Sequence, residues 1–225
     1  MKNGRLAALL ILLLPVVSGC HETTKPPVTT PSLVANDTPA HAMERLIASY
    51  EKKNESAFAG MFTGDYTYEF SNSTDPTLVM QYSSGWFKND ETMSSTHLFS
   101  GYTPSGGSTL SAASSIDINL LTGTPTDDNS SGVDPVTHKV LATAVEGQIV
   151  VPNPGADATT FVITNNFNVF YIVRGDSALN LDSSQPADSV HWYIYRWVDL
   201  TGTGAGANRS QAGSSTWGGL KATFR

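Results

Sequence analysis

The chain has 225 residues, enough for one large or two small domains, and its formal net charge at pH 7 is -7. Basic residues form no run after residue 20, so nucleic-acid binding is not expected. The only cysteine is Cys20, which excludes an intramolecular disulfide and a multi-cysteine metal site. The five histidines show no ligand spacing such as His-x-x-x-His, and we expect neither a metal nor another cofactor.

The first nineteen residues have the layout of a secretory signal peptide. Lys2 and Arg5 precede an apolar stretch at residues 6–14, which is too short to be a good membrane-spanning helix. Val-Ser-Gly-Cys follows at residues 17–20 and resembles a bacterial lipobox. The resemblance implies cleavage before Cys20, a diacylglyceryl thioether on its sulfur and an acyl group such as palmitate on its new amine. The alternative is an ordinary signal peptide with a cysteine near the cleavage point by chance.

Residues 20–37 are expected to be the lipidated cysteine and a flexible tether, and residues 38–225 the folded domain. The tether is rich in Pro and Thr and cannot bury enough apolar surface to fold. Removing the signal peptide would change the net charge from -7 to -9, because that peptide holds two basic residues and no acidic one. Contact with the membrane therefore depends on the lipid anchor on Cys20. We expect an exported envelope protein, and His21, in place of an aspartate, favours the outer membrane in a diderm bacterium.

Helices are predicted in the first half of the domain. Thr38 and Pro39 have the residue types of an N-cap and a first helical position, and apolar residues recur at helical spacing as far as Tyr50, so the first helix is predicted at 39–53. Asn54 is predicted to cap a short second helix that reaches Phe62. A strand at 66–70, a loop or helical turn from residue 75 and a third helix at 89–99 follow.

Strands are predicted in the second half, which makes the fold α+β. A strand-like stretch at 108–122 leads through a polar loop at 123–137 to three long strands. Because these runs are consecutive and turn-rich connections join them, we expect an antiparallel meander. The last segment, 215–224, is predicted to be a short edge strand or a turn. The long strands cover residues 139–151, 159–174 and 190–199, with polar connections at 175–188 and 201–215.

This order of elements resembles the NTF2-like, or SnoaL-like, cone. The resemblance rests on Ala-Phe-Ala-Gly-Met-Phe at 57–62, on His-Trp-Tyr-Ile-Tyr-Arg-Trp-Val-Asp at 191–199 and on Trp-Gly-Gly-Leu-Lys at 217–221. It covers most of residues 38–224 and implies N-terminal helices packed on a curved antiparallel sheet, with a pocket at the open end of the cone. Ketosteroid isomerases and scytalone dehydratase use that pocket, whereas many relatives bind a ligand, or a partner through the outer face of the sheet.

Candidate acids and bases are few. His97, on the third predicted helix, would need a carboxylate partner such as Asp117 or Glu69, and a surface or core histidine is the alternative. An isomerase of this fold needs a carboxylate base and a neutral acid beside an apolar pocket, and residues 65–69, with Tyr68, offer these types. The catalytic positions of the isomerases cannot be matched one by one. No catalytic residue is therefore assigned, and a non-catalytic role is favoured.

The strand predicted at 159–174 is apolar on both faces, so both faces should be covered. Helices would cover one face. The other face, which we expect around Phe170 and Ile172, would be covered by loops, a second subunit or a ligand. The opposite face carries Phe161, Phe167, Val169 and Tyr171.

Arginines and tryptophans complete the set of candidates. Arg174 and Arg196 would lie on neighbouring strands and either hold an anionic ligand or, as their spacing favours, pair with Asp176 and Asp199. The candidates for a pocket or interface are Tyr68, His97, Phe170, Ile172, Trp192 and Arg196.

Three hypotheses follow from the sequence. The first is a lipid-anchored envelope protein whose domain binds a small apolar ligand or a protein partner without catalysis. The second is a cofactor-independent pocket enzyme of the isomerase or dehydratase type. The third is a structural subunit of an envelope assembly, with a homodimer through the sheet face as one form of self-association.

Overall fold

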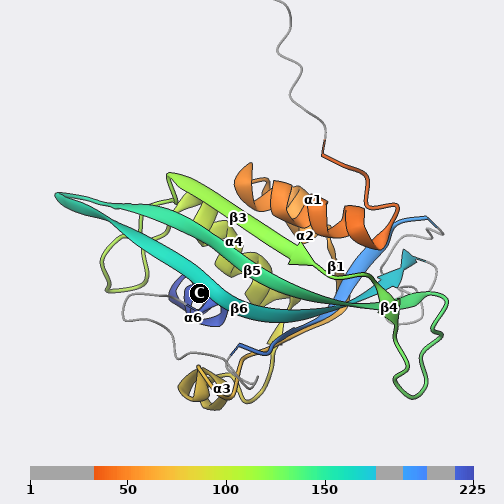
Figure 1. The fold of residues 1–225 in the computed structure, drawn as a ribbon. Helices are drawn as coiled ribbons and strands as arrows, with labels where there is room; N and C mark the ends of the chain where they lie inside the picture. Colours follow the sequence, from red (N-terminus) through yellow and green to blue (C-terminus); the bar gives the residue numbers. More distant parts are fainter. Residues whose placement is uncertain (1–32, 176–189, 202–215) are drawn as a thin grey trace, which may run out of the picture. The chain divides into compact units, whose positions relative to one another are not determined.

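The computed structural model describes residues 33–175, 190–201 and 216–225 (Figure 1). The predicted signal peptide, Cys20 and most of the tether lie outside these residues, as do nearly all of the connections predicted at 175–188 and 201–215. Residues just before the first helix already belong to the folded unit Leu33–Arg225. The Asn36 side chain donates to the Trp192 carbonyl at 2.7 Å, and the Trp192 N–H donates to the Asn36 carbonyl at 2.7 Å.

The first two helices form for local reasons that the sequence shows. Helix α1 (Pro39–Glu51) begins after Thr38, whose hydroxyl accepts from the His41 N–H at 3.1 Å. Helix α2 (Glu55–Ala59) begins after Asn54, which caps it in the same way. The predicted extension to Phe62 is wrong. Gly60 ends the helix, and strand β1 (Phe62–Glu69) starts two residues later.

Helix α3 (Pro76–Gln81) and the short strand β2 (Trp86–Phe87) lead into helix α4 (Lys88–Ser100). The predicted third helix is confirmed. Its start is fixed by the Asp90 carboxylate, which accepts from the Phe87 N–H at 2.9 Å. Gly101, with φ of 74°, ends it in a conformation that favours glycine.

A single sheet runs in the order β2-β1-β7-β6-β5-β3, with β4 paired to β5. The predicted meander of three long strands is confirmed, because β5, β6 and β7 pair antiparallel in sequence order. The expectation of a wholly antiparallel sheet is wrong at one place, where β1 pairs parallel with β7. A parallel pair needs a long crossover, and the whole middle of the chain provides it. The remaining strands are β3 (Ser115–Thr122), β4 (Thr126–Asp127), β5 (His138–Asn153), β6 (Ala156–Arg174) and β7 (Trp192–Asp199).

The last segment is a helix rather than the predicted edge strand or turn. Helix α6 (Trp217–Thr223) begins after Thr216, whose hydroxyl accepts from the Gly219 N–H at 2.9 Å. Trp217, Leu220 and Lys221 are spaced three and four residues apart and share one buried helix face. Burial of this face outweighs the two glycines that weaken the helix.

An irregularity in the long β5–β6 ribbon changes which residues share a face. Asn165 has φ of 55°, and the pairing register shifts between Val145 and Gly147. As a result Phe161 packs against Phe224 on the core side, whereas Phe167 is 47% exposed on the other side. The prediction that Phe161 and Phe167 share a face is therefore wrong.

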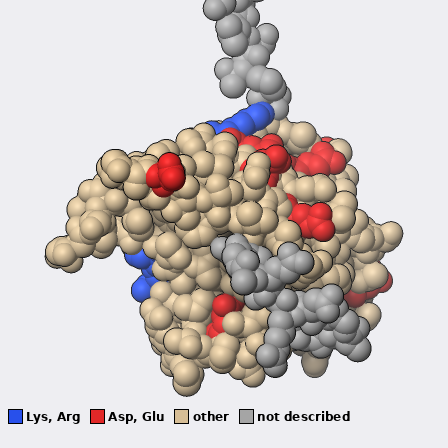
Figure 2. Space-filling view, turned by 60° about the vertical axis from the view of Figure 1, so that its left-hand side comes forward, with Lys and Arg blue, Asp and Glu red and all other residues tan. Residues whose placement is uncertain are grey.

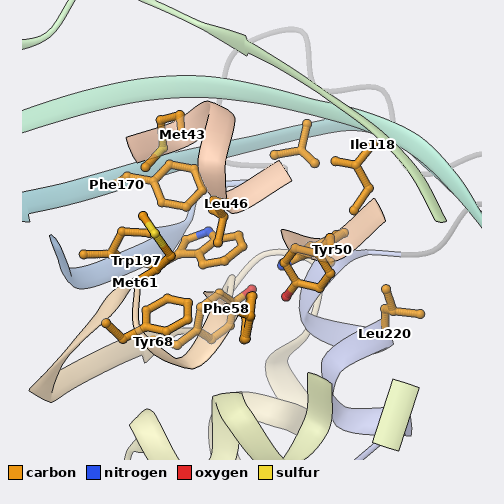
Figure 3. Close-up of a cluster of buried hydrophobic side chains, with 14 of the residues drawn as sticks. Met43, Leu46, Tyr50, Phe58, Met61, Tyr68, Ile118, Phe170, Trp197 and Leu220 are labelled. Carbon is orange, nitrogen blue, oxygen red and sulfur yellow. The ribbon is translucent and has the colours of Figure 1, made fainter. Parts of the chain in front are cut away.

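Helices α1, α2, α4 and α6 contribute to one buried cluster with the inner face of the curved sheet (Figure 1). Figure 3 shows part of this cluster, to which Leu46 and Tyr50 of α1, Trp197 of β7 and Leu220 of α6 all contribute. The predicted α+β architecture, helices packed on a curved sheet in a cone-like arrangement, is confirmed. Among the described helices, none has both the length and the apolar character required to span a membrane.

Gly147 offers a test of the tight spacing between β3 and β5. A Cβ at this position would lie 2.2 Å from the Asp117 carbonyl oxygen on the neighbouring strand. We expect Gly147→Ala to lower the free energy of unfolding by about 1–3 kcal/mol, because the strands must move apart. Gln148→Ala, at the exposed neighbouring position, should change it by less than about 0.5 kcal/mol. Urea unfolding measures both, and equal midpoints would contradict the close approach.

Candidate functional site

The carboxylate of Glu91, in the first turn of α4, is 0% exposed. Its Oε2 accepts from the Trp86 indole N–H at 3.0 Å and from the Tyr66 hydroxyl at 3.2 Å. The Tyr50 hydroxyl lies 3.5 Å from Oε1. A buried charge is costly unless it is paired and hydrogen-bonded, and these three donors come from β2, β1 and α1.

The counterion of Glu91 is Lys221, delivered by α6. Its ammonium nitrogen lies 2.7 Å from Glu91 Oε2, and the Lys221 side chain is 3% exposed. The same nitrogen lies 3.8 Å from the centre of the Tyr68 ring and 3.6 Å from that of Trp197. Aromatic faces attract a cation, most strongly where water is excluded. The ammonium is therefore held by one carboxylate and two rings.

Burial also sets the protonation of this site. Desolvation lowers the pKa of Lys221 to about 8, although Glu91 acts in the opposite direction. Burial, and after it the negative charge of Glu91, raises the pKa of Tyr50 and Tyr66 well above the usual 10. Burial and the nearby Asp199 do the same for Tyr68, whose hydroxyl lies 3.4 Å from that carboxylate. The three hydroxyls therefore act as neutral donors at neutral pH.

An apolar pocket adjoins the buried pair, because Tyr50 and Trp197 take part in both. It has room for about one water molecule at most. Side chains of α1, β3, β5, β7 and α6 form its wall. The lining residues are Leu46, Ile47, Tyr50, Ile118, Leu120, Val145, Trp197 and Trp217.

Two of the residues predicted from sequence, Tyr68 and Phe170, lie in or beside this centre, and a third, Ile172, lies in the same hydrophobic core. Tyr68 forms one wall around the ammonium of Lys221. Phe170 is fully buried, and its ring lies 4.4 Å from that of Trp197. Ile172 is also fully buried. The face around Phe170 and Ile172 is thus the face that packs on the helices. The prediction that loops, a second subunit or a ligand cover it is wrong.

The other three predicted residues lie apart from the pair. His97 Nδ1 lies 2.8 Å from the Phe224 carbonyl, and its ring stacks on Tyr102 at 3.9 Å. These partners differ from the predicted ones, which are the carboxylates of Asp117 and Glu69. Arg196 pairs with Glu69 at 2.7 Å, rather than with Asp199. Trp192 is buried at the start of β7, opposite Arg174 of β6. Asp176 lies outside the described residues.

Sequence reasoning missed Glu91 and Lys221, although a signal for each was present. In α4 the buried positions are Glu91, Ser94, Ser95, Leu98 and Phe99, which is the spacing of one helix face. Extending the face of Leu98 and Phe99 back by two turns leads to Glu91. Lys221 lies likewise between the apolar residues of the last segment, but that segment was not expected to be a helix.

Comparison with protein-family models gives no match, and comparison with curated proteins gives none either. Among solved structures, a ketosteroid isomerase-like protein from Erwinia carotovora atroseptica aligns over 76% of this chain and 95% of its own, with a TM-score of 0.42 and 9% identity. An NTF2-like protein of unknown function in nutrient uptake from Rhodospirillum rubrum aligns over 71% and 94%, with a TM-score of 0.38 and 12% identity. At TM-scores below 0.5, neither likeness supports a statement about the activity of this chain.

The fold and the site together define an α+β domain whose interior holds its own ion pair. Within the described residues, no group of three or more His, Cys, Asp and Glu is placed to hold a metal ion. What the arrangement of Glu91, Tyr68 and Trp197 can do chemically is bind an ammonium group away from water.

Breaking the pair should cost more than removing it. We expect Glu91→Gln or Lys221→Met alone to lower the free energy of unfolding by about 3–5 kcal/mol, because each leaves one buried charge unpaired. The double variant should lose clearly less than the sum of the two, with a coupling of about 0.5–3 kcal/mol. Glu69→Gln, at the half-exposed pair with Arg196, should cost no more than about 1 kcal/mol. Urea unfolding of the four variants is the measurement, and additive effects at Glu91 and Lys221 would contradict the pairing.

The low pKa of Lys221 predicts an unusual alkaline profile. Between about pH 8 and 10 the unfolded chain keeps a proton that folded Lys221 has released, since the pKa falls from the usual 10.5 to about 8. The free energy of unfolding should therefore rise with pH, by at most about 1.4 kcal/mol per pH unit. Above pH 10 it should fall, because Tyr50, Tyr66 and Tyr68 ionise only when unfolded. Chemical unfolding from pH 7 to 11 tests this, and the rise should be absent in Lys221→Met.

Proposed function

We propose that the chain is a lipid-anchored protein of the bacterial cell envelope. We further propose that its folded domain forms a homodimer through the outer face of its sheet. The lipobox-like residues 17–20 and the tether that follows support the anchoring. The observation that supports the binding is an apolar patch on the face of the sheet that points away from the core.

The outer patch spans four neighbouring strands. Direct pairing places Leu121 of β3 beside Ala144 of β5, and Ala144 beside Phe167 of β6. Leu121 is 56% exposed and Phe167 47%. A second row of cross-strand neighbours lies next to the first and is at least partly exposed; it consists of Ala142, Val169 and Val198. Contiguous exposed apolar surface of this kind is typical of interaction sites.

Charged groups border the patch without entering it. The Arg196–Glu69 pair lies beside Val198 on one side, and Glu146 is exposed beyond Ala144 on the other. A polar border around an apolar centre is the usual anatomy of a protein interface. On the face shown in Figure 2, the acidic side chains lie apart from one another with uncharged atoms between them, and few basic side chains are seen.

Binding of a small apolar ligand is the second candidate, and the pocket beside Trp197 and Trp217 favours it. Its lining is apolar, but its size limits a guest to very few atoms unless side chains move. A pocket enzyme of the isomerase type gains no comparable support from the described residues, since the buried Glu91 carboxylate is neutralised by Lys221. Partner binding through the outer patch is therefore the function that we favour.

The outer patch can be tested by its effect on oligomeric state. We expect residues 33–225 to sediment as a dimer, and Phe167→Asp to sediment as a monomer, because an unpaired carboxylate would be buried in the interface. Met80→Asp is the matched control, since Met80 is 70% exposed on α3, outside the patch, and should leave the dimer intact. Analytical ultracentrifugation distinguishes these results. A monomer without any substitution would contradict the proposal.

The anchor has its own test. In a diderm bacterial host the full-length chain should partition with membranes, and mass spectrometry of its N-terminal peptide should show acyl mass on Cys20. Cys20→Ser should release the protein from the membrane fraction, because the lipid supplies the stable attachment. An unmodified thiol at Cys20 would overturn the localisation and leave the patch proposal intact.

A further inference from the structure

The ammonium of Lys221 occupies a site built almost entirely by other elements. Glu91 comes from α4, Tyr68 from β1 and Trp197 from β7. We call these three residues the ammonium cage. Only the guest, Lys221, comes from the short C-terminal helix α6.

The carboxylate of the cage is held in place independently of its guest. Trp86 and Tyr66 both donate to Glu91 Oε2, the oxygen that also meets Lys221. Because these donors lie on β2 and β1, removing the Lys221 side chain takes neither of them away. The cage is thus organised as a receptor whose polar groups do not depend on α6.

The chemistry of the cage selects one class of guest. A carboxylate excludes anions, and the faces of Tyr68 and Trp197 attract cations. A primary ammonium brings three N–H donors on a compact charge, of which one meets Glu91 at 2.7 Å while the rings cover the others. A guanidinium is planar and larger, and a neutral alcohol offers no charge to the carboxylate.

We propose that the ammonium cage is a binding site for a primary alkylammonium group, and that Lys221 is an occupant supplied by the chain itself. Removal of that side chain beyond Cβ takes away three carbons and the ammonium nitrogen. The space left in Lys221→Ala therefore has the shape and charge of n-propylammonium. A free amine of this length completes the pair with Glu91 and restores the contacts with Tyr68 and Trp197.

The experiment is chemical complementation of Lys221→Ala in the full-length chain. n-Propylammonium should raise the Tm of this variant by about 5–10 °C at one hundred times its Kd, and the intrinsic tryptophan fluorescence, to which Trp86 and Trp197 contribute, should change with the same Kd. 1-Propanol has a similar shape without the charge and should have a much smaller effect. n-Propylammonium should not stabilise the unsubstituted chain, in which Lys221 fills the cage.

Two further variants make the result decisive. Lys221→Ala combined with Glu91→Gln should lose the response, because the carboxylate is gone. Lys221→Met fills the space with an apolar chain and should fold without binding the amine. If Lys221→Ala does not fold alone, n-propylammonium should restore its folding during refolding from urea. Equal effects of the amine and the alcohol, an equal effect on the unsubstituted chain, or no restoration while Lys221→Met folds would each overturn the proposal.

Discussion

The buried contact between Glu91 and Lys221 is the interaction on which the arrangement of this domain depends. It joins the last helix of the chain to α4, and through the donors to Glu91 it also engages β1, β2 and α1. Two charges lose their hydration here, and their mutual attraction rarely exceeds that cost by much. The contribution of the pair is therefore mainly positional, because any other placement of α6 would leave the buried Glu91 carboxylate without its counterion. The Ser94 hydroxyl, which donates to the Lys221 carbonyl at 2.8 Å, fixes the same register.

The two faces of the sheet have different roles, since one forms the core and the other is exposed. The inner face is covered by helices and contains the ion pair, so its polar groups are used internally. The outer face presents Leu121 and Phe167 in one lateral row across three strands. The irregularity near Asn165 sets this division, because it turns Phe161 inward and leaves Phe167 outward. A regular strand would have placed both on one side.

Features set by neighbouring residues could be predicted from the sequence, whereas contacts between distant segments could not. Thr38, Asn54 and the long β-branched runs predict the first helices and the meander, because caps and alternation act within a few residues. The parallel pairing of β1 with β7 joins segments far apart in the chain, and no local signal encodes it. The helix at 217–223 was missed because Gly218 and Gly219 oppose it locally, and tertiary burial of Trp217 and Leu220 outweighs them. With that helix missed, the partner of Glu91 could not be predicted.

Lys221 is covalently attached to the chain whose cage it occupies, and this attachment determines which site is available to other molecules. An attached ligand competes at an effective concentration in the millimolar range, so a free amine at lower concentration cannot displace it without much better contacts. Displacing α6 would also expose Trp217, Leu220 and Phe224, all of which are buried. The ammonium cage therefore stays occupied under ordinary conditions, and its recognition chemistry serves the fold. A partner is therefore expected to bind the outer face. Burial of the exposed apolar row there is favourable, and no side chain of the protein has to be displaced.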